Sequence, residues 1–240
     1  MKKIKMTLQE VMTELKGYAD ENTKKTYMRH GAREPYYGVK VQDVKKIVKK
    51  IKKDHELSLE LYATGNSDAM YMAGLIADES KISKDELRQW ADGAYWYMIS
   101  EYPVPWVAAE SPYAIELALE WMESDEERIA SCGWATLGYY AALKEDSELD
   151  IEMYSSLLDR AEKNVHNAQN QVRYTMNGFV IAVGAYISEL TAKASEVGGR
   201  IGKVEVDMGG TACKVPLAKD YIKKVVDKGR IGKKRKSARC

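Results

Sequence analysis

The sequence has 240 residues, of which 45% are hydrophobic, enough to bury the core of one large domain with an appendage. No stretch has the roughly 18 consecutive apolar residues of a membrane span, and the first ten residues lack the apolar centre of a signal peptide. We therefore expect a cytoplasmic protein without membrane contact. The three cysteines are odd in number and far apart, which favours free thiols over a disulfide framework or a metal site: Cys132, Cys213 and Cys240.

The net charge of +1 conceals a strong asymmetry along the chain. Residues 1–53 hold 15 Lys and Arg against 6 Asp and Glu, and residues 219–240 hold 10 against 2. Residues 54–218 hold 12 basic and 28 acidic residues. Two basic ends can offer a polyanion a local positive field despite the neutral total, whereas the acidic middle favours a protein partner. Lysine-rich helix faces that are merely solvated would give the same count at the N-terminus.

Helical periodicity dominates from the N-terminus onward. Apolar residues recur at helical spacing from Val41 to Ile51, with lysines between them, and again from Val172 to Leu190. Three pairs have the spacing of capping boxes, which predict helix starts: Thr7 with Glu10, Ser83 with Glu86, and Ser124 with Glu127. Few stretches are typical of strands. We predict an all-α fold in which antiparallel helix pairs stack as a curved, HEAT-like helical-repeat superhelix.

The C-terminal region departs from this pattern. Lys203 to Val215 alternates apolar and polar residues around Met208-Gly209-Gly210-Thr211, which predicts a small β-hairpin over 203–215. Residues 217–227 predict a short amphipathic helix, and GRIGKKRKSARC predicts a mobile basic tail. The predicted organisation is a helical solenoid over 1–196 and an appendage over 197–240.

Two tryptophans near a turn are candidates for base recognition. Trp96 and Trp106 can stack on a base or an extruded nucleotide, or they can fill gaps between helices. Glu101 lies between them in sequence and is the candidate catalytic carboxylate, although most carboxylates are ordinary exposed groups. The three histidines have no ligand spacing, so we expect no metal site and no cofactor.

Two further sets of polar residues suit nucleic-acid contacts. Asn170, Arg173 and Asn177 recur at i, i+3 and i+7, a polar ladder that can contact phosphates and sugars or form an ordinary solvated face. The tail offers cations that can follow a phosphate backbone: Arg230, Lys233, Lys234, Arg235 and Lys236. Alternatively, the tail keeps the protein soluble, or it folds back onto the acidic middle of the chain.

Three stretches carry a family resemblance: TYMRHGAREPYYGVKVQDVKKIVKKI, ELYATGNSDAMYMAGLIAD and VRYTMNGFVIAVGAYI. Read together, they resemble the AlkD-like DNA alkylation repair family, which consists of alkylpurine DNA glycosylases built from HEAT-like repeats. The resemblance covers roughly residues 6–196. It implies a basic concave face that holds the DNA backbone, and a pocket of Trp residues with one Asp that releases a cationic alkylated purine by hydrolysis of its N-glycosidic bond.

The chain departs from the family at the positions of this pocket. Ser100 stands one turn after Trp96, where the family has Asp, and Glu101 is the nearest carboxylate. The family's later Arg and Trp fall here at Ala130 or Ser131 and at Asn177. The resemblance implies a monomeric DNA-binding protein of the alkylation repair type, with glycosylase activity and RNA binding left open. The alternative is a catalytically inactive HEAT-like scaffold that binds protein or another nucleic acid.

Overall fold

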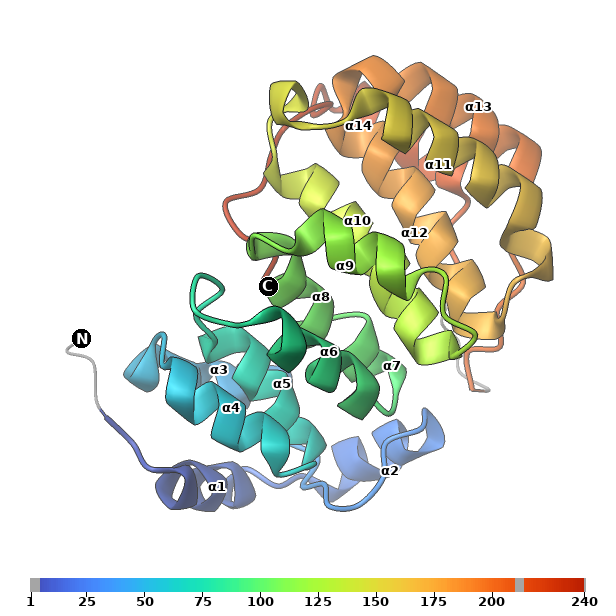
Figure 1. Ribbon diagram of the computed structural model, residues 1–240. Coiled ribbons are helices and arrows are strands. Elements are labelled where there is room, and N and C mark those ends of the chain that lie inside the picture. Colours follow the sequence, from blue (N-terminus) through green and yellow to red (C-terminus); the bar gives the residue numbers. More distant parts are fainter. Residues whose placement is uncertain (1–4, 210–213, 240) are drawn as a thin grey trace. The chain divides into compact units, whose positions relative to one another are not determined.

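The structure, a computed structural model, describes residues 5–209 and 214–239. Within these ranges it is helical and contains no strand, which confirms the all-α prediction (Figure 1). None of the helices found there is both long and apolar enough to cross a membrane. The helices are α1 (Leu8–Gly17), α2 (Glu21–Arg29), α3 (Val41–Ile51), α4 (His55–Ala63), α5 (Ser67–Ile76), α6 (Lys84–Gly93), α7 (Tyr97–Ser100), α8 (Pro103–Glu110), α9 (Ala114–Trp121), α10 (Glu127–Leu143), α11 (Ile151–Asn164), α12 (Asn170–Tyr186), α13 (Thr191–Ile201) and α14 (Ala218–Asp227), with 3-10 turns η1 (Asp146–Glu148), η2 (Val165–Asn167) and η3 (Ser188–Leu190).

Two of the three predicted capping boxes form, at Thr7 and at Ser83. The third, at Ser124, does not, because α10 begins only after Glu126, whose amide donates to the Ser124 hydroxyl at 3.1 Å. The Glu127 carboxylate accepts a hydrogen bond from an amide in the first turn of α12 at 2.7 Å instead of capping its own helix. A tertiary contact between α10 and α12 therefore replaces the expected local one.

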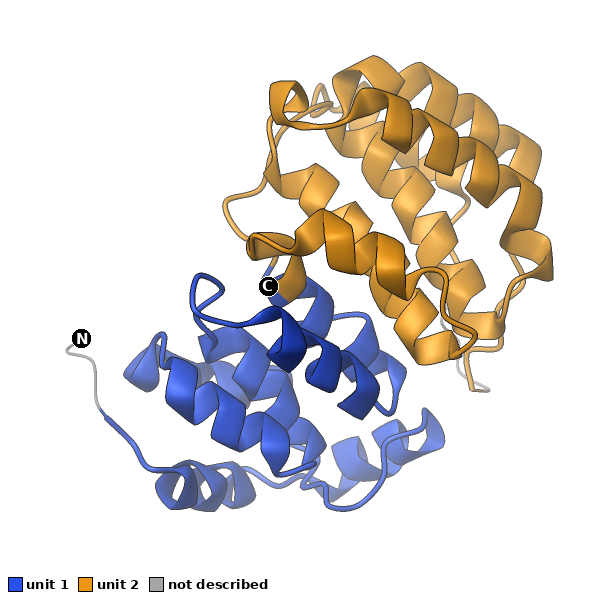
Figure 2. Cartoon of the chain, in the orientation of Figure 1, with its two compact units in different colours: residues 1–107, 239 blue, residues 108–238, 240 orange. Residues whose placement is uncertain are grey.

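The chain divides into two compact units (Figure 2): Met1–Val107 with Arg239, and Ala108–Ala238 with Cys240. In the first unit α5 is the central helix, since every residue from Ser67 to Ile76 is buried, and α1, α3, α4 and α7 contact it. Gly74 permits one of the closest approaches in this unit. A Cβ at Gly74 would lie 2.3 Å from the Cβ of Pro103, so a larger side chain would push the start of α8 away.

In the second unit α10 and α12 form the centre (Figure 1). α9 packs on α10, while α13 and α14 pack on α12. Phe179 lies between two other rings, with its centroid 5.1 Å from that of Trp134 and 5.9 Å from that of Tyr154. All three side chains are at most 1% exposed, so Trp134 belongs to the core.

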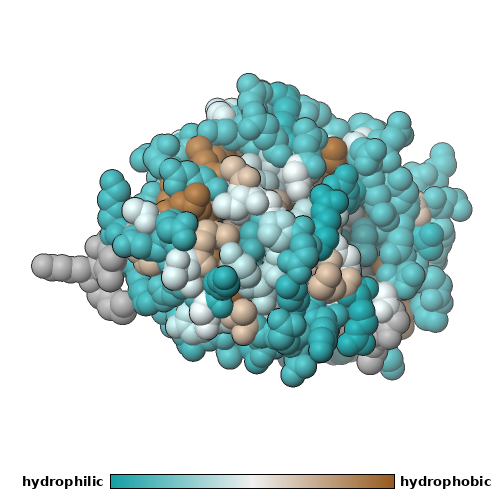
Figure 3. All heavy atoms as spheres, turned by 90° about the horizontal axis from the view of Figure 1, so that it is seen from below, coloured by the Kyte–Doolittle hydropathy of each residue, from teal (hydrophilic) through white to brown (hydrophobic). Residues whose placement is uncertain are grey.

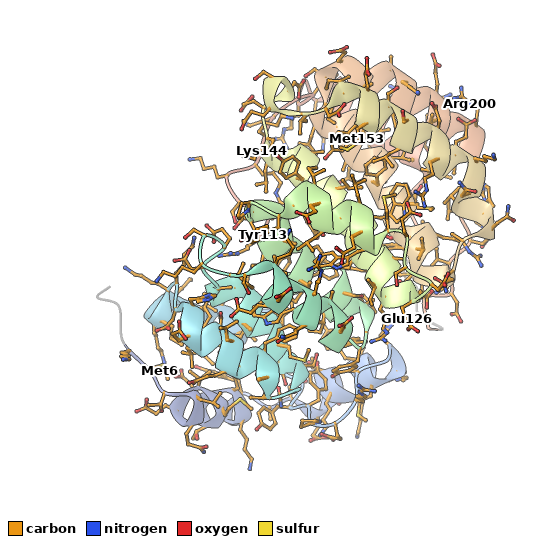
Figure 4. The ribbon with its side chains drawn as sticks, viewed as in Figure 1. Met6, Tyr113, Glu126, Lys144, Met153 and Arg200 are labelled. Atoms are coloured by element: carbon orange, nitrogen blue, oxygen red, sulfur yellow. The ribbon has the colours of Figure 1, made fainter. Side chains whose placement is uncertain are left out.

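Ion pairs join α11 to α13 at the surface of the second unit. Lys193 Nζ lies 2.8 Å from Asp159 Oδ2, and Arg200 Nε lies 2.6 Å from Glu162 Oε1. Figure 4 labels Arg200 on α13. Exposed pairs of this kind contribute about 0–1 kcal/mol each, so the buried rings account for more of the stability.

The predicted β-hairpin over 203–215 is wrong. Residues 203–209 and 214–215 form no strand, and the expected turn at 210–213 lies outside the described residues. The alternation that suggested a strand is real, since Val204 is buried while Glu205 and Asp207 are exposed. However, the extended segment packs beside α12 and bonds to its side chains, so a helix takes the place of the second strand. The helix expected over 217–227 is confirmed as α14.

Candidate nucleic-acid interface

Trp96 lies in an aromatic cluster of the first unit. It precedes α7, is 5% exposed, and donates from Nε1 to the Ser67 hydroxyl at 2.8 Å. Its ring centroid lies 5.7 Å from that of Tyr27, 6.3 Å from that of Tyr36 and 5.2 Å from that of Tyr97. The cavity left beside these rings measures about 20 Å³. Sites for small organic ligands usually measure about 300–1,000 Å³, so this cluster is closed to a purine base.

A buried carboxylate that sequence reasoning missed lines the same cavity. Asp68 on α5 is 4% exposed and accepts backbone hydrogen bonds from Tyr37 (2.8 Å), Gly38 (3.1 Å) and Val39 (2.8 Å). Burial raises the pKa of Asp68 to about 6, although the three amides and Lys24 act in the opposite direction. The available signal was an Asp directly before the apolar run AMYMAGLI. Its contacts show that it fixes the 37–39 loop.

Glu101, the candidate acid, is the residue after the last one of α7. Its amide donates to the Tyr97 carbonyl at 2.9 Å, and its side chain is only 3% exposed. Ser100, which stands at the family's Asp position, is 1% exposed. As folded, neither side chain is open to a substrate. Access to either of them would require α7 to move.

Trp106 belongs to a different ring cluster from Trp96. It is fully buried, and its ring meets those of Tyr71 and Tyr102 edge-on, with centroids 5.5 Å and 5.8 Å away. The two tryptophans proposed as a base-binding pair thus have separate aromatic partners. In this structure both tryptophans fill gaps between helices, which was the alternative to base recognition.

The polar ladder on α12 holds the chain's own C-terminal segment. Arg173 donates from Nε to the Ala168 carbonyl at 2.7 Å and from Nη1 to the Glu205 carbonyl at 3.0 Å. Asn177 donates from Nδ2 to the Pro216 carbonyl at 2.9 Å. Asn170, the third member, donates to the Asp207 carbonyl and accepts from the Asp207 amide. These contacts explain why the ladder carries Asn and Arg in place of a solvated Glu and Lys mixture.

The basic tail is packed onto the second unit, in contrast to the mobile tail that composition suggested. The amide of Gly232 donates to the Ala185 carbonyl at 2.9 Å, and that of Arg235 donates to the Ala142 carbonyl at 2.7 Å. A Cβ at Gly232 would lie 2.4 Å from the Ser188 hydroxyl oxygen, so this close approach requires glycine. The alternative in which the tail folds back onto the chain describes this arrangement.

Lys234 is the anchor of the tail. Its ammonium donates to the carbonyls of Ala141 (3.0 Å) and Tyr186 (2.7 Å) and lies 2.8 Å from Asp146 Oδ1. The side chain is 8% exposed. All these partners belong to the ends of α10 and α12 or directly follow them, so Lys234 fixes the tail there rather than offering its charge to a ligand.

The tail, α12 and α14 enclose a groove of about 640 Å³ within the second unit. Small side chains of α12 line one part of it, and tyrosines and cations line the rest. Among the described residues, the side chains of Arg230, Lys233 and Arg235 have no ion-pair partner. The lining residues are Tyr174, Asn177, Gly178, Ile181, Ala182, Ala185, Tyr186, Pro216, Tyr221, Val225, Arg230, Lys233, Lys234 and Arg235.

The groove combines positive charge, ring faces and an apolar wall, which suits an anionic ligand with a flat part. α12 meets the C-terminal stretch of α14 and the tail there, and of the lining only Asn177 and the tail cations were singled out from the sequence. No group of three or more His, Cys, Asp and Glu suited to a metal ion occurs in the part of the chain that the structure describes. Cys132 is buried, while Cys213 and Cys240 lie outside the described residues.

The lysine-rich α3 is less available than its composition suggests. Lys46 pairs with Asp43 at 2.7 Å, Lys50 with Glu14, and Lys53 with Glu79. Half of the six lysines from Lys45 to Lys53 are therefore partly neutralised within the first unit. Arg230, Lys233 and Arg235 beside the groove have no ion pair with a described residue, which makes the second unit the stronger candidate for a polyanion.

Comparison with known proteins adds independent information. Residues 11–195 match the family model described as DNA alkylation repair enzyme. An uncharacterized protein of Listeria monocytogenes is 33% identical over 225 residues, which cover 91% of this chain and 97% of that protein. An uncharacterized protein of Listeria innocua is 32% identical with the same coverage.

A solved structure shares the fold with a TM-score of 0.89 and 38% identity, covering 98% of this chain and all of the other. It represents a family of proteins that is related to the HEAT-like repeat DNA glycosylases and has affinity for branched DNA structures. The all-helical structure therefore has the fold of HEAT-like repeat proteins. This likeness extends beyond the matched family region into the C-terminal segment.

Proposed function

This chain is a member of the DNA alkylation repair enzyme family, and from that premise we propose that it binds DNA, branched DNA above all, without excising bases. The related protein of known structure supports the choice of branched DNA, because its family has that affinity. The observation that carries the proposal is the cluster of cations at the packed tail that have no ion pair with a described residue.

The tail cations are suited to phosphate contacts because their main chain is already fixed. Arg230, Lys233 and Arg235 line the groove, and Lys236, next along the chain, is exposed. None of the four has an ion pair with a described residue, so DNA would displace only water and counterions from them. Contacts of this kind bind the DNA backbone without reading its sequence.

Three features support binding without base excision. The position of the family's catalytic Asp is occupied by a buried Ser100, the neighbouring Glu101 is 3% exposed, and the cavity beside Trp96 measures about 20 Å³. A glycosylase needs room for the base and a carboxylate near the developing oxocarbenium ion. The closed cluster around Trp96 offers no room for a base in this conformation, and the carboxylate that lines it, Asp68, is bonded to the amides of the 37–39 loop.

The test uses one protein preparation and two assays. Fluorescence anisotropy compares a four-way junction with a fully paired linear duplex of the same sequence, at several salt concentrations. We expect tighter binding of the junction and a decrease of affinity with salt. In the second assay, duplex DNA with N3- and N7-alkylated purines is incubated with the protein, and we expect no release of free base above the protein-free rate. Equal affinity for both DNAs would remove the branched preference, and base release would remove the claim of inactivity.

The second candidate function is a scaffold that binds another protein. It is favoured by exposed apolar side chains at the second unit: Leu217, Tyr221, Val226 and Ile231. Protein interfaces usually need a contiguous apolar patch. On the face seen in Figure 3, hydrophobic residues form small patches between hydrophilic ones. Absence of any DNA binding in the anisotropy assay would favour this candidate.

A further inference from the structure

The groove of the second unit has a wall that suits a flat ring. Gly178, Ala182 and Ala185 of α12 present little bulk, and the rings of Tyr174 and Tyr221 also line the groove. Tyr221 is 48% exposed, so one of these rings is available to a ligand. The volume of the groove, about 640 Å³, is within the usual range of about 300–1,000 Å³ for sites that enclose small organic groups.

The cations of the groove are fixed relative to that wall. Lys234, held by two carbonyls and Asp146, ties the tail to α10 and α12. Its neighbours Lys233 and Arg235 therefore start from an ordered main chain. Because less conformational freedom is lost on binding, cations placed in this way bind an anion better than those of a mobile tail.

We propose that this groove binds an unpaired stretch of DNA, with phosphates against Arg230, Lys233 and Arg235 and a base against Tyr221 and the small residues of α12. The proposal rests on the DNA binding proposed above and names the part of a branched DNA that the chain recognises. Only unpaired nucleotides can place a base face on a ring, since bases in a duplex are already stacked on each other. Branch points with unpaired arms supply such nucleotides.

Gly178 offers a direct way to block the groove. A Cβ at this position would meet no heavy atom within 4 Å, so a larger side chain can enter the open space without disturbing α12. Glycine is also a poor helix former, so replacement should not weaken the helix. A matched control is Gly17 at the end of α1, where an added Cβ likewise meets nothing within 4 Å.

The experiment measures anisotropy with three probes: a paired duplex, the same duplex with unpaired thymidine arms, and thymidine monophosphate. We expect the wild-type protein to bind the armed duplex at least about tenfold more tightly than the paired one, as one stacked base is typically worth about 1–3 kcal/mol. Gly178→Trp should bring the ratio of the two affinities to about one, whereas Gly17→Trp should keep it at the wild-type value.

A charge variant tests the same groove without adding bulk. The double variant K233Q/R235Q should lose affinity for the armed duplex, and Lys163→Gln, an exposed α11 position with no ion pair to a described residue, should not. Circular dichroism melting checks that each variant folds. If Gly178→Trp does not fold, the charge variant alone decides.

The outcomes separate the two proposals. Wild-type protein that binds none of the DNA probes would overturn DNA binding and the groove site together. Binding of both duplexes with a ratio that Gly178→Trp and K233Q/R235Q leave unchanged would overturn the groove site alone. Thymidine monophosphate bound as tightly as the armed duplex would also overturn it, because the groove would then be a site for free nucleotides.

Discussion

Asn170 and Asp207 form a reciprocal pair of hydrogen bonds. The Asn170 amide donates from Nδ2 to the Asp207 carbonyl at 3.0 Å, and its Oδ1 accepts from the Asp207 amide at 2.7 Å. The pair closes one end of the contact between α12 and the extended segment that precedes α14. A side chain that bonds to both the N–H and the C=O of one residue substitutes for the strand partner that the segment lacks.

The first prediction concerns this pair. Asn170→Ala removes both hydrogen bonds and should lower the free energy of unfolding by about 1–2 kcal/mol. Urea unfolding measures the loss, and hydrogen exchange of the Asp207 amide should become faster. If Asn170 served DNA instead of the fold, the variant would lose affinity as strongly as Lys233→Gln while keeping wild-type stability.

The second prediction concerns the pH dependence set by Asp68. Burial raises its pKa from 3.8 to about 6 in the folded protein, so the folded state binds this proton more tightly than the unfolded chain. The protonated carboxyl therefore contributes stability that is fully present below pH 3.8 and is lost as the pH rises through 6. The loss should be about 3 kcal/mol across this window.

The measurement compares the wild-type protein with Asp68→Asn in urea at pH 4 and pH 7. An amide nitrogen cannot accept the backbone hydrogen bonds, so the variant should be less stable throughout. The difference in free energy of unfolding between the wild-type protein and the variant should shrink between pH 4 and pH 7. If this difference instead grew with pH, the three amides would lower the pKa of Asp68 more than burial raises it.

The third prediction contrasts two adjacent lysines. Lys234→Met removes the ammonium that donates to two carbonyls and pairs with Asp146, which still accepts from the Ser188 amide, so the free energy of unfolding should fall by about 2 kcal/mol. Lys233→Met should change stability by less than about 0.5 kcal/mol but weaken DNA binding, since Lys233 is exposed and has no described ion pair. Chemical denaturation and anisotropy on both variants would reveal the opposite pattern if Lys234 were the phosphate ligand.

The fourth prediction concerns salt. Each phosphate contact adds about 0.9 to the slope of log affinity against log salt concentration. Replacing Arg230, Lys233, Arg235 and Lys236 by Gln should therefore flatten the slope by roughly three to four units if all four reach phosphates. Substitution is preferable to deletion of residues 228–240, because the packed tail also supports the fold. Equal slopes for both proteins would show that these side chains do not contact DNA.

The sequence predicted what depends on local periodicity. The helix from Val41 to Ile51 was expected at the bounds where α3 lies, and two capping boxes mark real helix starts. Prediction from the sequence failed where contacts with residues far away in the chain determine the local structure. The alternation after Lys203 is that of an extended chain, but nothing in it indicates that side chains of α12 take the place of a second strand. The division into 1–196 and 197–240 and the roles proposed for Glu101 and the ladder stay predictions.

The candidate site was less predictable for the same reason. The composition of the tail indicates charge and mobility, and only the carbonyls at the ends of α10 and α12 show that Lys234 is immobilised. Trp96 and Trp106 flank one turn in the sequence but pack against different rings. The groove requires α12, α14 and the tail together, and no single stretch of sequence contains it.

The hydrogen bond from Asn177 to Pro216 joins the extended segment to the groove, because both residues line it. Order in the segment and occupancy of the groove are therefore thermodynamically linked. A ligand that binds more tightly when the segment is ordered must slow the hydrogen exchange of the segment's described amides. Loosening the segment must then lower the affinity for the ligand by the same factor. The ladder on α12 thus couples the extended segment, through Asn177, to a ligand in the groove.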